Sequence, residues 1–346
     1  MVKTNLKAMT KQELDTFIKA AGLPAYRARQ ILHWIYERYA ESIQDVTELS
    51  KDLREKLAEQ AYISTLAVLS RQRSSDGTEK FLFGLGDGES IESVLIPDED
   101  RLTLCISSQV GCAMCCRFCL TGTMGLKRNL EAYEIVDQVI AVNRTIAPGR
   151  ITNIVLMGMG EPLANFDNVV EALWRITELV KISAKRITLS TSGLAPKILE
   201  LAHKGPKVKL AISLNAATDE VRDQLMPVNR TYPLKVLLDA CRKFPLQAGR
   251  RITFEYVLLK GVNDSLEDAR RLVELLKGIP SKINLIPFNP YPGAEFQRPD
   301  DQQVLAFQNI LLAAHMTAII RKSKGQDILA ACGQLKARYS GKRTAL

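Results

Sequence analysis

Short apolar segments alternate with longer amphipathic segments over the C-terminal part of the chain. The short segments have strand character and occupy residues 101–108, 152–158, 186–192, 209–215, 252–259, 282–288 and 317–323. Between them, segments such as 129–142, 168–180 and 265–279 have apolar residues at helical spacing. This alternation predicts a parallel sheet covered by helices. Six units of this size fit an incomplete barrel better than a closed eightfold one, although a doubly wound sheet also matches because the pattern does not define strand order.

The N-terminal residues have a helical pattern of their own. Thr10 and Glu13 form a capping box that opens a first helix. Segments 25–40 and 50–61 have the apolar spacing of two further helices. Residues 1–62 are therefore predicted to form a small helical domain.

A third pattern separates this helical domain from the alternating region. Residues 63–104 contain short alternating runs with Asp-Gly turn signals at 76–77 and 87–88. Such runs predict a meander of β-strands. We therefore expect a short β linker here, followed by the barrel region with its C-terminal segment at 105–346.

Composition narrows the class of protein. No uninterrupted apolar run approaches the roughly 20 residues of a membrane helix, and the first residues lack the apolar core of a secretory signal. We therefore expect a cytoplasmic protein that does not contact a membrane. The net charge of +9 fits a polyanionic partner, although a solvated basic surface would give the same value. Seven cysteines, four of them clustered, fit metal or redox chemistry better than a disulfide framework.

The clustered cysteines lie in "GCAMCCRFCLTGTMG", residues 111–125, directly after the first strand of the alternating region. Two CxxC pairs would suit zinc, but the adjacent Cys115 and Cys116 would then have to converge on one ion, and no His is near. Alternatively, Cys112, Cys116 and Cys119 hold an iron–sulfur cluster and leave one iron open to a chelating ligand. Cys115 then has no ligand role. Spacing alone favours the second interpretation and leaves the first open.

Polar residues follow several of the later strands. The segment "GMGEP", from Gly158 to Pro162, could begin a dinucleotide-binding motif, but position 163 is Leu and the motif fails. Its glycines would let the backbone approach a ligand, and Glu161 could accept from an ammonium or a ribose. Further polar residues at strand ends are Ser190, Ser192, Ser213, Asn215 and Asn289. Each alone could be a turn residue, but their recurrence predicts a ligand site at the rim of a β/α barrel.

Three cysteines lie outside the cluster. Cys241, in a predicted helix, is interpreted as a small buried hydrophobic residue. Cys105 lies in the strand that leads into the cluster, and Cys332 lies in "DILAACGQL" beside Gly333. The small neighbours of Cys332 would let a substrate approach it, so a catalytic and a structural role are both open.

Together, the CxxxCxxC loop, "GMGEP" and "AACGQL" resemble the radical S-adenosylmethionine (radical SAM) superfamily. More narrowly, the chain resembles the RlmN/Cfr group of RNA adenine methyltransferases, from "LPAYRARQIL" through "STSGLAP" to "NLIPFNPYPGAEF". "SQVGC" and "GMGEPLAN" look more like the RlmN branch, which methylates C2 of adenine, than like Cfr, which methylates C8. The resemblance implies a partial (β/α)6 barrel with a small N-terminal helical domain.

The resemblance also implies residue roles. Cys112, Cys116 and Cys119 would hold a 4Fe–4S cluster. Cys332 would carry the methyl group, Cys105 would be the resolving thiol, and Glu92 the proton acceptor. The residues implied to contact SAM are Gly160, Glu161, Ser190, Ser213, Leu214, Asn215 and Asn289. Asn215 departs from the group, which commonly has "SLH" where this chain has "SLN".

The implied reaction uses two SAM molecules per turnover. One methylates Cys332, and the other is reductively cleaved to a 5′-deoxyadenosyl radical that takes hydrogen from this methyl group. The carbon radical adds to C2 of adenine, a base removes the C2 proton, and a transient disulfide between Cys105 and Cys332 releases the RNA. The implied partners are 23S rRNA, tRNA and a reductant such as flavodoxin, with the protein acting as a monomer.

Basic residues are candidates for phosphate contacts in this interpretation. Lys127 and Arg128 follow the cluster loop, and Arg321 precedes Cys332. Further candidates are Arg27, Arg29, Lys322, Lys324, Lys336, Arg338, Lys342 and Arg343. Three functions remain open from the sequence: an RlmN-type methyltransferase, another radical SAM enzyme such as a C8 methyltransferase, and a zinc-stapled RNA-binding protein without enzymatic activity.

Overall fold

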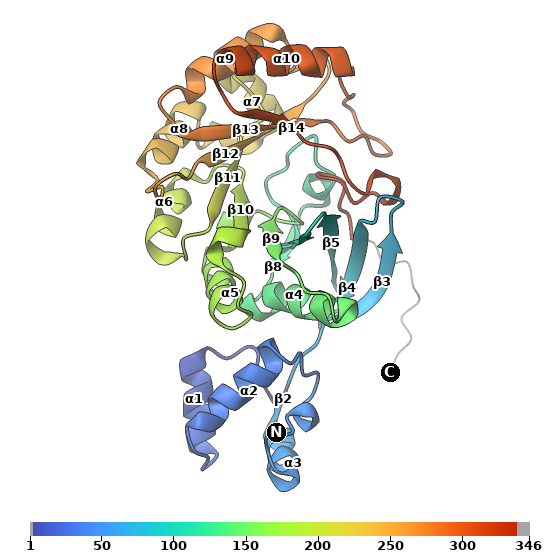
Figure 1. The fold of residues 1–346 in the computed structure, drawn as a ribbon, viewed down its shortest axis with the longest axis vertical. Coiled ribbons are helices and arrows are strands. Elements are labelled where there is room, and N and C mark those ends of the chain that lie inside the picture. The colour runs from blue at the N-terminus through green and yellow to red at the C-terminus, as the bar shows by residue number, and fades with distance from the viewer. Residues whose placement is uncertain (1–2, 338–346) are drawn as a thin grey trace.

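A single ten-stranded sheet is the centre of the computed structural model, which describes residues 3–337 (Figure 1). Seven parallel strands follow one another in chain order, so each β/α unit lies beside the previous one. They are β6 (Arg101–Cys105), β9 (Asn153–Leu156), β10 (Ile187–Thr191), β11 (Lys209–Ser213), β12 (Ile252–Leu258), β13 (Ser281–Pro287) and β14 (Ala318–Ile320). Within the described chain, β14 is an edge strand, so the barrel stays open. The predicted α/β partial barrel is confirmed.

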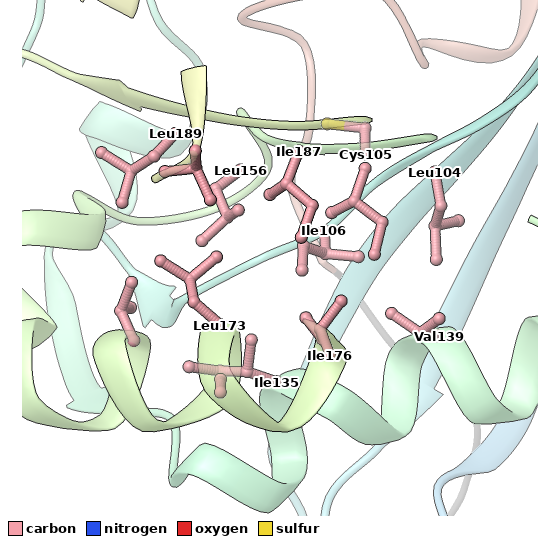
Figure 2. Close-up of a cluster of buried hydrophobic side chains, with 14 of the residues drawn as sticks. Leu104, Cys105, Ile106, Ile135, Val139, Leu156, Leu173, Ile176, Ile187 and Leu189 are labelled. Atoms are coloured by element: carbon pink, nitrogen blue, oxygen red, sulfur yellow. The ribbon is translucent and has the colours of Figure 1, made fainter. Parts of the chain in front are cut away.

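Helices cover the outer face of the parallel strands (Figure 1). They are α4 (Ala132–Ile146), α5 (Phe166–Glu178), α6 (Ala195–Lys204), α7 (Asp219–Leu225), α8 (Leu234–Lys243), α9 (Leu266–Leu276) and α10 (Asp301–Ala313). In Figure 2, Leu104 points from β6 toward Val139 of α4, whereas the sulfur of Cys105 points to the opposite side of the sheet. Each fully buried Leu or Ile in this layer contributes about 1.5–3 kcal/mol. The helices thus stabilise the sheet from outside and leave its inner face for the site.

Three antiparallel strands extend the same sheet: β3 (Ala67–Arg73), β4 (Glu79–Gly84) and β5 (Ser90–Asp98). The predicted meander is therefore present, but it is part of the barrel sheet as well as a connection. β5 pairs directly with β6, and Val94 lies opposite Cys105. Residues of β5 consequently lie beside a candidate catalytic cysteine.

The N-terminal helical domain packs beneath α4 and α5 (Figure 1). Its elements are β1 (Thr4–Asn5), α1 (Lys11–Ala20), α2 (Tyr26–Tyr36), α3 (Lys51–Gln60) and β2 (Ala61–Tyr62). The Thr10–Glu13 capping box is present. A buried ion pair joins Lys7 Nζ to Asp137 of α4 at 2.7 Å, and the guanidinium of Arg175 in α5 donates to the carbonyls of Lys7 and Met9. These contacts attach the domain to the barrel.

The cysteine loop is closed at its base by a small antiparallel pair, β7 (Gln109–Gly111) and β8 (Leu126–Asn129). The Cys112 amide donates to the Gly125 carbonyl at 2.9 Å. A Cβ atom on Gly111 would lie 1.9 Å from the same carbonyl oxygen. The two ends of the loop can approach this closely only because residue 111 has no side chain.

Among residues 3–337, no helix is long and apolar enough to cross a lipid bilayer.

Candidate active site

A pocket opens on the inner face of the sheet, at the carboxyl ends of the parallel strands, and has about 950 Å³ of empty volume including its mouth. It brings together the three proposed ligand cysteines, Gly160, Glu161, Ser190, Ser213, Asn215, Asn289 and Cys332. These residues come from the cysteine loop, from the ends of four strands (β9, β10, β11 and β13) and from the C-terminal segment. This is the position at which β/α barrels build their sites.

The proposed ligand cysteines face this pocket, whereas Cys115 does not line it. Burial raises the pKa of Cys112 to about 12 and also raises the pKa of Cys116 and Cys119, which the neighbouring cysteines raise further. Such thiols become thiolates when a positively charged metal centre binds them. Cys115 is exposed and has a left-handed backbone, with φ of 51°. That conformation turns its side chain away from its neighbours.

The chemistry of the donor set fits an iron–sulfur cluster. Cys112, Cys116 and Cys119 line the same pocket. Cysteine thiolates are the ligands that iron–sulfur clusters use, so these three side chains could hold such a cluster.

Glu161 is bound on both oxygens by backbone amides. Its carboxylate accepts from Leu163 at 3.0 Å and from Ser192 at 2.6 Å, and its own amide donates to Gln109 Oε1 at 2.8 Å. Burial raises the pKa of Glu161, and the two amide donors oppose that rise. Glu161 therefore joins the ends of β9 and β10. Its carboxylate has further lone pairs that can accept from a ligand.

Both polar atoms of the Asn215 side chain contact other residues of the protein. Its side-chain oxygen accepts from the Val257 amide at 2.9 Å, and its side-chain nitrogen contacts Met226 Sδ at 3.3 Å. Its backbone is left-handed, with φ of 59°, which Asn tolerates better than most residues. Leu214 does not line the pocket: its side chain is fully buried, and its amide donates to the Glu255 carbonyl.

Asn289 connects the barrel rim to the segment that carries Cys332. Its Nδ2 donates to the Cys332 carbonyl at 3.3 Å, and its Oδ1 accepts from Ser323 and Gln326. On the other side of Cys332, the Leu120 amide donates to the Gly333 carbonyl at 2.7 Å. Hydrogen bonds on both sides thus hold the Cys332 turn at the mouth of the pocket.

Cys105 and Cys332 line a second, smaller cavity together with Arg321, which also lines the main pocket. Burial raises the pKa of Cys105 to about 12, and Cys332 raises it further, because two thiolates would repel each other. Arg321 opposes that rise, and the pKa of Arg321 is in turn raised by Cys332. Neither thiol forms a disulfide in this structure.

Glu92 lies in β5, on the side of the sheet that Cys105 faces. Its carboxylate forms an ion pair with Lys80 at 3.3 Å and accepts from the Lys336 amide at 2.8 Å. Glu92 is buried and does not line the main pocket. Its predicted role as proton acceptor is not tested by this arrangement.

The candidate phosphate-binding residues have different environments. Arg321 is half-buried and lines the pocket. Lys127 pairs with Glu89 at 2.7 Å, and Arg128 forms a two-pronged contact with Glu134. Arg338, Lys342 and Arg343 lie outside the described residues.

One pocket residue, Glu255, was missed by the sequence analysis. Glu255 Oε2 and Ser192 Oγ are buried at the pocket without a hydrogen-bond partner. Unpaired buried polar atoms are costly, and a bound ligand with complementary groups would satisfy them. The residues therefore fit a polar organic ligand such as SAM beside the cluster. A charged residue within the apolar strand "ITFEYVLL" was the signal that could have identified Glu255.

The open parallel barrel and its three-cysteine loop define a radical SAM protein. The family model described as "Radical SAM superfamily" matches residues 106–275, and the model described as "Ribosomal RNA large subunit methyltransferase N-terminal domain" matches residues 4–63. A radical SAM methyltransferase from Sphaerobacter thermophilus has a similar structure, with a TM-score of 0.92 and 46% identity over 97% of this chain and 100% of its own.

Curated relatives specify the family further. The dual-specificity RNA methyltransferase RlmN of Pelobacter propionicus is 53% identical over 99% of this chain and 98% of its own length. That of Geotalea uraniireducens is 55% identical over 98% of both chains. The chain belongs to the RlmN family of radical SAM methyltransferases.

Proposed function

We propose that this protein methylates the C2 carbon of adenine in 23S rRNA and in tRNA. The observation that carries the proposal is that Cys105 and Cys332 meet at one cavity that adjoins the pocket of the three-cysteine loop. Its relatives at 53% and 55% identity are named as dual-specificity RNA methyltransferases, which supports RNA as the substrate.

In this proposal Cys112, Cys116 and Cys119 hold a 4Fe–4S cluster. When bound, the cluster supplies the electron that cleaves SAM reductively. The protein's own contribution is to bind and orient SAM at the barrel rim, which Gly160 lines. The other proposed contacts are Glu161, Ser190, Ser213, Leu214, Asn215 and Asn289. All of these except Leu214 line the pocket.

Cys332 is the proposed methyl carrier. Its sulfur displaces S-adenosylhomocysteine from one SAM and so takes up the methyl group, while a second SAM provides the radical. Asn289 and Leu120 hold the turn that carries Cys332 by hydrogen bonds. Cys332 lines both the main pocket, where SAM is proposed to bind, and the smaller cavity of Cys105. Burial of this chamber shields the reactive intermediate from water.

Glu92 and Cys105 are proposed to complete the reaction as proton acceptor and resolving thiol. The radical adduct would return one electron to the cluster, and Glu92 accepts the C2 proton. The Cys105 thiolate then attacks the Cys332 sulfur, which forms a disulfide and breaks the bond between Cys332 and the transferred carbon. That carbon takes up a proton to become the methyl group, and the external reductant returns the disulfide to two thiols. The placement of Glu92 and Cys105 on β5 and β6, on one side of the sheet, supports a shared task. An electron donor of the flavodoxin type, a monomeric state and a cytoplasmic location remain predictions.

Nucleoside mass spectrometry tests the function. Anaerobically reconstituted protein is incubated with SAM, reductant and separated 23S rRNA and tRNA that lack the modification, and the RNA is digested. We expect 2-methyladenosine from both RNAs, and none with Cys332→Ala. Formation of 8-methyladenosine instead would assign the chain to C8 chemistry, and colourless protein without iron would contradict the radical reaction.

Cys105→Ala tests the resolving step. Without this thiol the covalent link between Cys332 and the RNA cannot be broken, so a protein–RNA adduct should accumulate. Denaturing gel electrophoresis with labelled RNA detects the adduct. Free methylated RNA produced at the wild-type rate would show that Cys105 does not have this role.

A further inference from the structure

Glu255 is a buried carboxylate with one oxygen left unpaired. It lies in the middle of β12, is 5% exposed, and its Oε1 accepts from Asn284 at 3.0 Å. Its Oε2 has no partner and lies at the pocket. Carboxylates in such positions are rare in a strand core, because removal from water is costly unless both oxygens are satisfied.

Arg321 presents unused donors to the same pocket. It follows β14 directly, its backbone amide donates to the Leu285 carbonyl, and the side-chain contact of its guanidinium is with Met157 Sδ at 4.0 Å. A guanidinium has five N–H donors in a planar fork. Most of these donors are therefore available to a molecule in the pocket.

The two groups form a complementary pair. The strand register brings them to the same face of the sheet. Glu255 and Val257 lie on the inner face of β12, and Val257 pairs with Ile286 of β13. The residue before Ile286, Leu285, pairs with Ile320 of β14, so Arg321, which follows Ile320, lies next to Ile286. Glu255 can accept from an amino group and Arg321 can donate to a ring nitrogen, while their charges cancel. A neutral aminopurine edge has this combination of donor and acceptor.

We propose that Glu255 and Arg321 bind the edge of the target adenine, with Glu255 accepting from its exocyclic amine and Arg321 donating to a ring nitrogen. This inference rests on the proposed function, because adenine as target comes from there. SAM also carries an adenine, but Arg321 lines the small cavity of Cys105 and Cys332 as well as the main pocket. That position places Arg321 beside the thiols that act on the RNA base, and Glu255 lines the main pocket that Arg321 also lines.

The test combines a protein change with a substrate change. Reconstituted wild type and Glu255→Gln are compared on two model RNAs, one with adenosine and one with purine ribonucleoside, which lacks the amine, at the target position. With adenosine RNA, kcat/KM should fall about 10- to 100-fold in the variant, as expected for loss of a hydrogen bond to a charged group. With purine RNA, the variant and the wild type should differ by less than about 3-fold, because the partner of Glu255 is already missing.

A binding measurement and a matched control complete the design. Fluorescence anisotropy without reductant measures the Kd of each RNA. Glu255→Gln should bind adenosine RNA more weakly than wild type does, and both proteins should bind purine RNA alike. Glu274→Gln makes the same change on the exposed face of α9, where the side chain is 69% exposed, and should behave as wild type on both RNAs. Arg321→Lys, which keeps the charge but not the fork, should weaken RNA turnover.

The outcomes separate the possible sources of the adenine. RNA-independent methylation of Cys332 and RNA-independent cleavage of SAM are measured in the same preparations. If Glu255→Gln slows these as much as it slows RNA methylation, the pair binds the adenine of SAM and the proposal is overturned. An equal loss on both RNAs would overturn it too. Absence of 2-methyladenosine from the wild type would instead contradict the proposed function itself.

Discussion

Position 111 accepts only glycine, for a reason that concerns the whole cysteine loop. Gly111 has φ of +78°, and a Cβ there would collide with the Gly125 carbonyl. That carbonyl is the acceptor for the Cys112 amide, so the collision would separate a proposed ligand from the base of its loop. The absence of a side chain at Gly111 therefore allows the loop to close and holds Cys112, the first of the three thiols, in place.

Gly111→Ala should fold but fail to hold a cluster. The added Cβ opens the β7–β8 pair at the point where the loop closes, so the three thiols no longer face one position. Iron and sulfide analysis after anaerobic reconstitution measures this. Gly249→Ala is the matched control, because Gly249 also has positive φ, of +73°, but no atom lies within 4 Å of an added Cβ. Equal iron contents in both variants would contradict the proposed steric cause.

Cys115 and Cys116 are adjacent in sequence but face different environments. Cys115→Ser should bind as much iron and sulfide as wild type, because its side chain is exposed and lies off the pocket. Cys116→Ser should lose most of the cluster, since one of three thiolates is removed. Elemental analysis and the visible absorption spectrum distinguish the two. Loss of iron from Cys115→Ser would restore the four-cysteine interpretation.

At the scale of elements, continuous apolar runs were a reliable guide where strands are buried on both faces. The strands around Leu189, Ile212 and Phe254 were predicted because continuous apolar runs between helices indicate parallel strands. The meander was predicted as a linker, but its pairing with β6 was not, because pairing depends on residues distant in sequence. β7 and β8 were missed, since strands of three and four residues are too short to show a period.

Prediction of the candidate site has the same limit: contacts between residues distant in sequence cannot be predicted from a local pattern. The cysteine loop and the Cys332 segment are recognisable because their residues are contiguous. The cavity shared by Cys105 and Arg321 is not, because it depends on how β6 and β14 lie on one sheet face. The sequence therefore did not predict that Arg321 lies beside Cys105.

The three antiparallel strands β3, β4 and β5, here called the β extension, anchor the segment that carries Cys332. Asp327 accepts from the Ser74 hydroxyl at 2.6 Å and from the Ser75 amide at 3.1 Å, and Asp76 accepts from the Gly325 amide at 2.9 Å. These contacts join the turn between β3 and β4 to the C-terminal segment. The extension therefore has a role in positioning the catalytic segment.

Asp327→Ala should release this segment without unfolding the barrel. Two hydrogen bonds are lost, so local opening becomes more frequent and trypsin should cut after Lys322 about 10-fold faster. Mass spectrometry of timed digests locates the cut. The control is Asp98→Ala, which removes an exposed ion pair with Arg101 at the far end of β5. An unchanged cutting rate would mean that the anchor lies elsewhere.

For the whole molecule, the interface between helical domain and barrel depends on buried charge. Lys7 and Asp137 are almost inaccessible to solvent, and burial raises the pKa of Asp137 to about 6 while Lys7 opposes that rise. Arg175 adds two hydrogen bonds to the same N-terminal segment. Removing a single partner would leave an uncompensated charge in the interface.

Lys7→Met should lower the free energy of unfolding by about 3–5 kcal/mol, the usual result of breaking a buried ion pair from one side. The double variant Lys7→Met/Asp137→Leu should recover most of this loss, because no charge is left buried. Urea denaturation followed by circular dichroism gives both values. A double variant as unstable as the single one would show that the pair fixes geometry beyond its charge balance.

The fold holds the two proposed catalytic thiols in different ways. Cys105 belongs to a strand that is paired on both sides, with β5 and with β9. Cys332 lies beyond the last strand, on a segment held by separate hydrogen bonds and by the buried Ala330 and Leu335. In the proposed reaction the Cys332 sulfur has to reach SAM, the base and the other thiol in turn. A thiol outside the sheet can change position between these steps without breaking a strand pair, whereas Cys105 cannot.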